Sequence, residues 1–194
     1  MTRKTHVVAG VATVLLADVP LIGYLTRQGI ITDAFIPAIV CGVAGGYIGS
    51  ILPDLDYPTH LATKSDNELT PQERNLKYNH RGGLHSLILP IIIILFNLSQ
   101  SELVKRYDSD FICNVLFGRL GFFDGVVIAY LVHLLADMFT LKGVRIGWPI
   151  LRENISFTKI KLFRILGESQ SLWLIFYLFI LFIFYAIYYK IATA

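Results

Sequence analysis

The chain has 194 residues, of which 55% are hydrophobic and 16% are charged, and its formal net charge is +3 at pH 7. A soluble domain carries about 25% charged residues, so this composition excludes an ordinary soluble protein and predicts an integral membrane protein. The basic residues are spread over several loops, which excludes a nucleic-acid-binding surface. Cys41 and Cys113 lie in apolar stretches without CxxC spacing and are expected to be buried thiols.

Two apolar segments come first. Residues 5–25 hold Asp18 as the one residue certain to be charged, and their length suits a bilayer span. Because Asp18-Val19-Pro20 interrupts the apolar core and no A-x-A-like cleavage site follows, we expect a mature helix and not a signal peptide. Residues 34–53 are uncharged and rich in glycine, which allows close helix–helix approach in a membrane.

A polar region follows the second apolar segment. Asp54 and Asp56 come directly after Pro53, where two carboxylates are either a solvated helix end or oxygen ligands for a metal. The loop 57–79 carries charges of both signs, so we expect it to be solvated.

A glycine turn with two histidines begins the third apolar segment, residues 85–101. The turn reads His80-Arg81-Gly82-Gly83-Leu84-His85-Ser86. The glycines permit tight backbone geometry, and Ser86 is suited to cap a helix or to support a ligand residue. Arg81 offers a contact for an anionic substrate.

The fourth apolar segment, residues 120–140, carries His133 and Asp137 four residues apart. Both side chains therefore leave the same face of a helix. An ionisable pair in apolar surroundings is unfavourable by several kcal/mol unless it is compensated. A divalent metal would compensate both groups, since imidazole nitrogen and carboxylate oxygen are zinc ligands. The alternative is a buried His–Asp hydrogen bond that packs two helices.

A basic segment and an apolar segment close the chain. Residues 142–168 hold six lysines and arginines, and the piece 155–166 interleaves apolar and basic residues, as a segment on an anionic leaflet would. Residues 169–189 are uncharged and rich in aromatics, which is typical of a membrane anchor. With no internal repeat visible, we interpret residues 1–194 as one all-α, membrane-embedded domain.

Five membrane crossings would bring every candidate ligand to one side, because successive segment ends alternate between the two faces. The predicted fold is thus a polytopic helical bundle with spans at about 5–25, 34–53, 85–101, 120–140 and 169–189. All five histidines of the chain then fall on one side, which favours a metal centre over scattered packing residues. The candidate ligands are His6, Asp54, Asp56, His80, His85, His133 and Asp137.

The basic residues predict the orientation of this bundle. Twelve of the 17 lysines and arginines lie on the side of the candidate ligands. The positive-inside rule therefore places the candidate site at the cytoplasmic face.

Several short motifs, in matching order from residue 5 to about 150, resemble the YdjM-like family of bacterial inner-membrane proteins, which are regarded as metal-dependent hydrolases. The motifs are Thr5-His6, Leu52-Pro53-Asp54-Leu55-Asp56, the turn from His80 to Ser86, and Tyr130 to Asp137 with Thr140, Gly143 and Trp148-Pro149. The resemblance implies a bacterial inner-membrane location. It also implies metal ligation by His6, Asp54 or Asp56, His80 or His85, His133 and Asp137.

The family's arrangement is in turn similar to that of zinc-dependent phospholipase C, an all-helical enzyme in which an H-x-x-x-D carboxylate bridges two zincs. The predicted site holds one to three zinc ions. On that analogy Asp137 bridges two of them. One ion would take His133, Asp56 and a histidine of the 80–85 turn, and another would take His6. Two positions depart from the family pattern. Leu84 stands where the family usually has threonine. The family also often has a glutamate a few residues past a glycine near the last span, and because Glu168 is displaced from that position, we leave it out of the site.

These interpretations predict a membrane metallohydrolase with a water-exposed site. Bound zinc would make hydroxide available near neutral pH and polarise a phosphoryl oxygen. Arg81 is expected to contact the substrate anion, and whichever of Asp54 and Asp56 is not a ligand is expected to transfer a proton. A site at headgroup level favours a phosphoester of a lipid or of another amphipathic molecule.

Two other classes of protein stay open. In a non-catalytic membrane protein, the same residues would form a structural metal site or a polar network that serves a partner, and a fully coordinated metal would support that reading. In a small ion-coupled transporter, Asp18, Asp124 and Asp137 would be intramembrane ligands. A deep cavity that reaches Asp124 from both sides would support the transporter.

Overall fold

A computed structural model describes residues 3–27, 35–56, 65–73, 83–106, 121–140, 143–151, 153–157 and 169–193. Within these ranges the chain is helical apart from short connections, and its one β feature is an isolated antiparallel bridge between Val144 and Ile155. The all-α fold class predicted from the sequence is confirmed.

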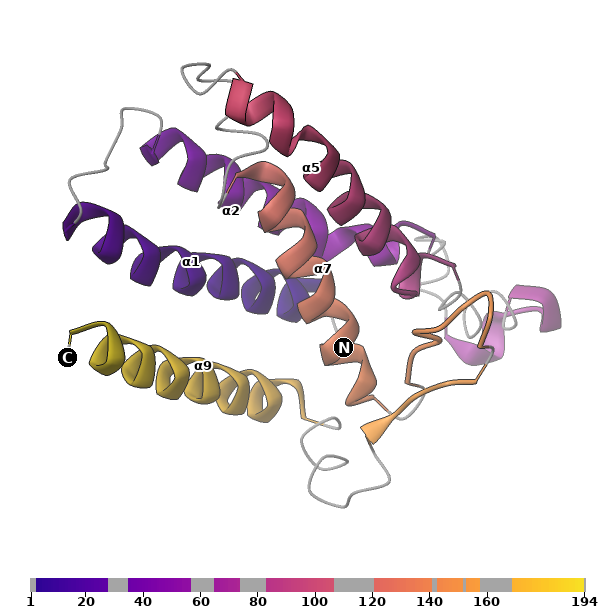
Figure 1. Cartoon of the computed structure of the whole chain (residues 1–194). Coiled ribbons are helices and arrows are strands. Elements are labelled where there is room, and N and C mark those ends of the chain that lie inside the picture. The colour runs from indigo at the N-terminus through magenta and orange to yellow at the C-terminus, as the bar shows by residue number, and fades with distance from the viewer. Residues whose placement is uncertain are drawn as a thin grey trace.

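Long helices form the body of the described chain. They are α1 (Arg3–Arg27), α2 (Phe35–Ile51), α5 (Ile88–Arg106), α7 (Phe122–Met138) and α9 (Gln170–Thr193). Three short 3-10 helices accompany them, namely η1 (Leu52–Asp56), η2 (Asp66–Glu68) and η3 (Gly83–His85). Consecutive long helices run in opposite directions, so the start of α1, the end of α2, the start of α5 and the end of α7 lie toward one end of the bundle (Figure 1).

One of these helices has the length and the apolar composition of a membrane span. It is the segment Ile36–Leu55, which comprises most of α2 and most of η1. The other apolar helical stretches of the described chain are shorter: Lys4–Ala17, Ile88–Gln100 and Ser171–Ile183. The number of five spans therefore stays a prediction.

Large apolar side chains are exposed on the outer faces of several helices. A soluble monomer seldom exposes so many, whereas a bilayer solvates them. The exposed side chains include Ile36 and Val40 of α2, Ile91, Ile92 and Leu95 of α5, and Ile175, Phe179 and Phe182 of α9.

Helices α2 and α7 approach each other closely because glycines line their contact. A Cβ atom added to Gly49 of α2 would lie 2.2 Å from the backbone oxygen of Val126 in α7. One added to Gly125 of α7 would lie 2.0 Å from the backbone oxygen of Gly42 in α2. The glycines of 34–53 thus allow the close packing that they predicted, and the helix they pack against is α7, which carries His133.

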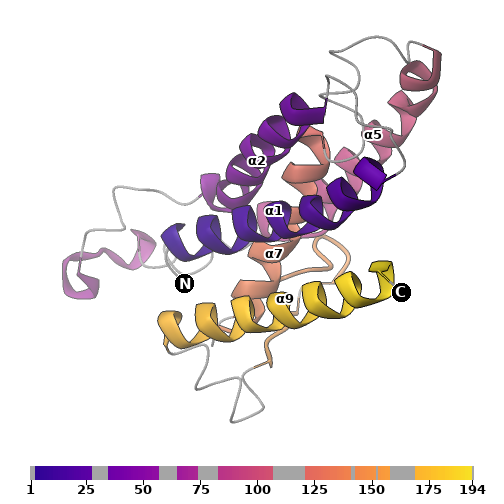
Figure 2. The same cartoon turned by 90° about the vertical axis from the view of Figure 1, so that its left-hand side faces the viewer.

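Helix α9 runs beside α1 in both views (Figures 1 and 2). Trp173 of α9 is fully buried against Ala9 of α1 and Val132 of α7, and its ring stacks on Tyr177 with centroids 4.9 Å apart. The hydroxyl groups of Tyr177 and Thr13 share a hydrogen bond. The aromatic segment predicted as an anchor is therefore attached to the rest of the bundle.

Candidate metal centre

Five ionisable side chains from four elements meet at one end of the bundle. Residues His133 and Asp137 of α7 lie on the same face of the helix, as their spacing predicts. They are joined by His6 from the first turn of α1, Asp54 from η1 and His85 from the end of η3. We call these five residues the His/Asp cluster.

The sequence explains how each neighbouring element delivers its side chain. Helix α2 ends at Ile51, and Pro53 in the following turn has no backbone N–H to continue the helical ladder. The chain therefore turns at η1, which carries Asp54. On the other side, the short turn η3 begins at Gly83, the second glycine of the turn, and ends with His85, three residues before α5 begins at Ile88.

The imidazole nitrogens of the cluster face its carboxylate oxygens. His6 Nε2 lies 3.4 Å from Asp137 Oδ1, and His85 Nε2 lies 3.5 Å from Asp137 Oδ2. His85 Nε2 is also 3.5 Å from Asp54 Oδ1, while His133 Nε2 is 3.7 Å from Asp54 Oδ1 and 3.8 Å from Asp137 Oδ2. Two ligands that each lie about 2.0–2.2 Å from a tetrahedral zinc ion are separated by about 3.4 Å. The observed separations suit a shared cation.

Most of the cluster is shielded from solvent. His6, His85, His133 and Asp137 are at most 1% exposed, whereas the side chain of Asp54 is 20% exposed. Burying several ionisable groups together is costly unless they are neutralised or ligate a metal. Asp54 lies on the accessible side of the cluster.

A hydrogen bond fixes the orientation of the His133 ring. His133 Nδ1 lies 2.6 Å from the backbone oxygen of Ser50, which can only accept, so Nδ1 carries the hydrogen. The unprotonated Nε2 of the neutral ring then points toward Asp54 and Asp137, and it has no hydrogen-bond partner among the described residues. Without a cation between them, the lone pair of Nε2 and the two negatively charged carboxylates would repel each other. A carbonyl that holds the second nitrogen is the usual support of a metal-binding histidine.

The rings of His6 and His133 support each other. They are stacked, with centroids 3.8 Å apart and an angle of 16° between their planes. His6 Nδ1 is also buried without a hydrogen-bond partner in the described part of the chain.

Two further groups hold the elements of the cluster in place. The Tyr130 hydroxyl donates a hydrogen bond to the backbone oxygen of Leu84, the residue before His85. Thr140 donates from its backbone N–H and its hydroxyl to the backbone oxygen of Asp137, at 3.0 Å and 2.7 Å. No role for Tyr130 was predicted from the sequence, although its position three residues before His133 on α7 places it on the same side of the helix.

The described residues yield two overlapping ligand sets. His6, His133 and Asp137 form one, and Asp54, His85 and His133 form the other, with the possible ligand atoms of each set within 4.8 Å of one another. The residue types are those of a zinc site, and the orphaned Nε2 of His133, which faces both carboxylates, fits the same interpretation.

Three predicted site residues cannot be placed in this cluster. His80 and Arg81 lie outside the described residues, and for Asp56 only the backbone at the end of η1 is described. The side chain of Asp18, named for the transporter alternative, also lies outside them.

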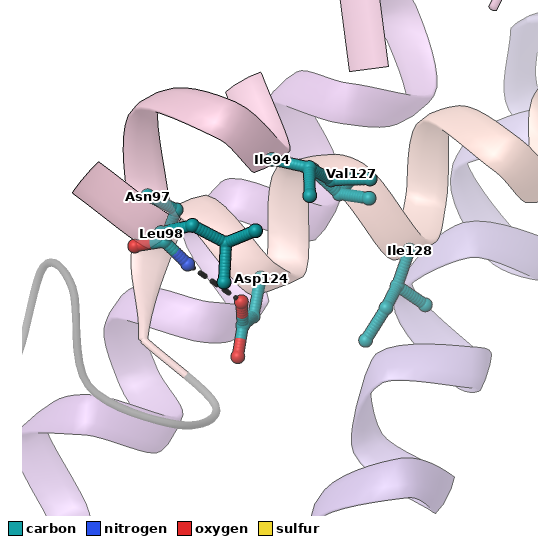
Figure 3. A pocket seen from close by; sticks show the side chains of 6 residues that line it. All are labelled: Ile94, Asn97, Leu98, Asp124, Val127 and Ile128. Atoms are coloured by element: carbon teal, nitrogen blue, oxygen red, sulfur yellow. Dashed lines mark hydrogen bonds between the residues drawn. The ribbon is translucent and has the colours of Figure 1, made fainter. Parts of the chain in front are cut away.

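Asp124 lies in the first turn of α7, whereas His133 and Asp137 lie toward the other end of that helix. Figure 3 shows Asp124 beside Asn97 of α5. Asn97 Nδ2 of α5 donates to Asp124 Oδ1 at 2.9 Å, so the structure supplies a partner that the sequence did not suggest. The two side chains share a pocket of about 170 Å³. Its lining contains no member of the His/Asp cluster and consists of Ile94, Asn97, Leu98, Asp124, Val127 and Ile128.

Fold and site together define a helical membrane protein with a candidate metal centre at one end of its bundle. The family model for the YdjM inner membrane protein matches residues 1–194, and the chain belongs to this family. This confirms the predicted family and the inner-membrane location, and with them an association with the lipid bilayer.

The curated relatives carry the same name. The chain is 32% identical over 108 residues to the inner membrane protein YdjM of Escherichia coli (strain K12), a match that covers 55% of this chain and 48% of that protein. The inner membrane protein YdjM of Shigella flexneri gives the same values. The chain thus spans about half the length of the curated relatives it matches. No solved structure matches it.

Proposed function

We propose that the His/Asp cluster binds divalent metal, with zinc as the expected ion, and that the protein is a membrane-bound metal-dependent hydrolase. The observation that carries this proposal is the orientation of His133. Its Nδ1 donates a hydrogen bond to the Ser50 carbonyl, and its buried Nε2 points toward the carboxylates of Asp54 and Asp137. That arrangement is unfavourable in an empty polar network and favourable around a cation.

The two oxygens of Asp137 are directed to different histidines. Oδ1 faces His6, while Oδ2 faces His85 and His133. A carboxylate with both oxygens engaged in this way is suited to hold two ions, which supports the bridging role that the family resemblance implied. His133 has one nitrogen left for a metal and would serve one ion only.

A bound zinc ion would supply metal-activated water and polarise a phosphoryl oxygen. Asp54 is the cluster residue with access to solvent, so it can exchange a proton with water entering the site. Ser50, through its carbonyl, keeps the His133 ring in one tautomer. Arg81 stays our prediction for the contact to the substrate anion, and Asp56 and His80 stay predicted ligands.

A lipid or other amphipathic phosphoester is the substrate class that suits this location. The cluster lies at the end of the bundle, where α1 and α5 begin and α2 and α7 finish (Figure 1). In an inner-membrane protein the ends of apolar helices lie near the headgroups. Exposed isoleucines lie along α5 from its first residue, at this end of the bundle, toward the middle of the helix.

Metal analysis of the detergent-purified protein tests the proposal. We expect the wild type to carry a transition metal, and Asp137→Asn and His133→Ala to lose it. Asp124→Asn is the matched control, since it makes the same exchange on the same helix outside the cluster and should keep the metal. Absence of metal from the wild type, even after reconstitution with zinc and manganese, would overturn the metal centre.

Turnover is tested separately with lipid phosphoesters and soluble phosphoesters. Hydrolysis by the wild type and by Asp124→Asn, but not by Asp137→Asn, is the expected result. Turnover of soluble esters without any turnover of lipid phosphoesters would contradict the proposed substrate class.

The burial of four of the five cluster residues favours a second candidate, a structural metal site. A structural site has all its positions filled by protein, whereas a catalytic site keeps one open. Cobalt substitution distinguishes the two. Absorption bands that change on addition of phosphate would indicate an open position, and unchanged bands would indicate the structural site.

A further inference from the structure

Residues 144–151 and 153–155 belong to a hairpin that is closed by the bridge between Val144 and Ile155 and exposes an apolar tip. Ile150 is 88% exposed, Leu151 60% and Trp148 38%, and Pro149 between them is also exposed. A run of consecutive apolar residues on the surface requires a reason, because water solvates it poorly.

The exposure of this tip is built into an ordered hairpin. At its base, Val144 and Ile155 exchange backbone hydrogen bonds of 3.0 Å and 2.8 Å. Nearer the tip, Leu151 N–H donates to the Gly147 oxygen at 2.8 Å and Trp148 N–H to the Arg145 oxygen at 3.0 Å. The backbone thus holds the tip side chains outward.

The base of the hairpin is anchored in the core. Val144 is fully buried and packs with Tyr130 and Leu134 of α7. On the other side of the hairpin, Ser156 Oγ donates a hydrogen bond to the backbone oxygen of Thr140 at 2.8 Å. The Thr140 hydroxyl in turn donates to the backbone oxygen of Asp137. The hairpin therefore lies at the end of the bundle that carries the His/Asp cluster, as Figure 1 shows in orange.

The hairpin lies beside an exposed apolar face of α5. Leu87 N–H donates to the Ile146 oxygen at 3.0 Å, which holds the hairpin beside the start of α5. The exposed side chains of Ile88, Ile91 and Ile92 follow within the next five positions on that helix. In an inner-membrane protein this face of α5 contacts acyl chains, so the apolar tip extends it toward the headgroups.

We propose that the tip formed by Trp148, Pro149, Ile150 and Leu151 inserts into the lipid leaflet at the end of the bundle that carries the cluster. Tryptophan prefers the membrane–water interface, and Arg145 in the same hairpin suits anionic headgroups. Four side chains are too few for a stable protein interface, which takes about 20–30 residues a side, but they are enough for an interfacial anchor. The proposal does not depend on metal or activity.

The two tryptophans of the chain make the test direct. Trp173 is buried between helices, whereas Trp148 is on the tip. Trp173→Phe leaves Trp148 as the only tryptophan, and Trp148→Phe is the matched variant that leaves Trp173. Each full-length variant is placed in nanodiscs of phosphatidylcholine with a minor share of phosphatidylglycerol, so that aqueous quenchers reach both faces. Brominated phosphatidylcholines then report the depth of the emitter.

We expect bromines near the headgroups to quench the fluorescence of Trp148 more than bromines at the ends of the acyl chains do. We also expect iodide in the aqueous phase to quench it only weakly. Leu151→Asp should weaken the lipid quenching and increase that by iodide. Strong iodide quenching without lipid quenching would place the tip in water and overturn the proposal. Protection from both quenchers would mean that protein covers the tip, which also overturns it. If Trp173→Phe does not fold, the difference between wild type and Trp148→Phe gives the same information.

Discussion

Single residues decide whether the His/Asp cluster can hold a cation. His133 is set by the Ser50 carbonyl, and Asp137 is held through its backbone by Thr140. Tyr130 acts one step further away, since its hydroxyl holds Leu84 and thereby the turn that presents His85. A ring or carboxylate that is held in this way loses less freedom when a metal binds.

At this scale we predict that Tyr130→Phe weakens metal binding without abolishing the fold. The substitution keeps the buried ring but removes the donor to the Leu84 oxygen. Removing a supporting hydrogen bond of a metal site typically lowers the affinity by about 10–100-fold. Zinc titration with a competing chelator measures the change, and Tyr47→Phe, at an exposed position of α2, is the control. An unchanged affinity in Tyr130→Phe would show that the turn does not depend on this bond.

Helix α2 is the element that positions the cluster most directly. It brings the Ser50 carbonyl to His133 and delivers Asp54 immediately after its end. Both contacts require α2 to lie close against α7, and Gly49 permits this because a side chain there would meet the Val126 carbonyl. Close approach of small residues is a principal source of helix association in membranes.

We predict that Gly49→Val lowers the melting temperature and reduces the metal content together. The added side chain forces α2 away from α7, and overpacking of this kind costs about 1–3 kcal/mol. The matched control is Ala44→Val, at an exposed position of the same helix. Thermal unfolding in detergent and metal analysis give the two readouts. A stable variant with unchanged metal would mean that the helices adjust without moving the cluster.

At the scale of the whole molecule, we expect metal binding and stability to be linked. The side chains of the cluster come from α1, η1, η3 and α7, so an ion there would connect segments that are far apart in the sequence. A ligand that binds only the folded state at a hundred times its Kd stabilises it by about 2.7 kcal/mol. A bound ion would therefore act as a cross-link of the bundle.

Chelation is accordingly expected to lower the melting temperature of the wild type but not that of Asp137→Asn. The variant should already melt at the lower temperature, because it has no ion to lose. Parallel melting curves with and without a chelator provide the measurement. Equal shifts in both proteins would assign the effect to the chelator itself and not to the cluster.

The number of spans is also a property of the whole molecule. The five predicted crossings would place the two ends of this chain on opposite faces, and the positive-inside rule would place the cluster at the cytoplasmic face. A fluorescent protein fused before Met1 should therefore be fluorescent in the cytoplasm, and alkaline phosphatase fused after Ala194 should be active in the periplasm. Two fusions that report the same side would contradict an odd number of spans.

The sequence by itself determined the features that depend on local spacing. Composition predicted a helical membrane protein, and the four-residue interval between His133 and Asp137 placed both on one face of α7, because the helical repeat is local. Motif order in addition indicated the family, which the match over residues 1–194 confirms. The alternation of segments predicted that His6, Asp54 and His85 would come to the same end.

Only the tertiary structure decided how these groups face each other. The acceptor for His133 is a backbone carbonyl at Ser50, and the support of His85 is a hydroxyl from Tyr130. Backbone atoms are the same at every residue, so no sequence pattern marks which carbonyl is used. That choice depends on the rotation and the separation of α2 and α7, which are set by glycine contacts across the two helices.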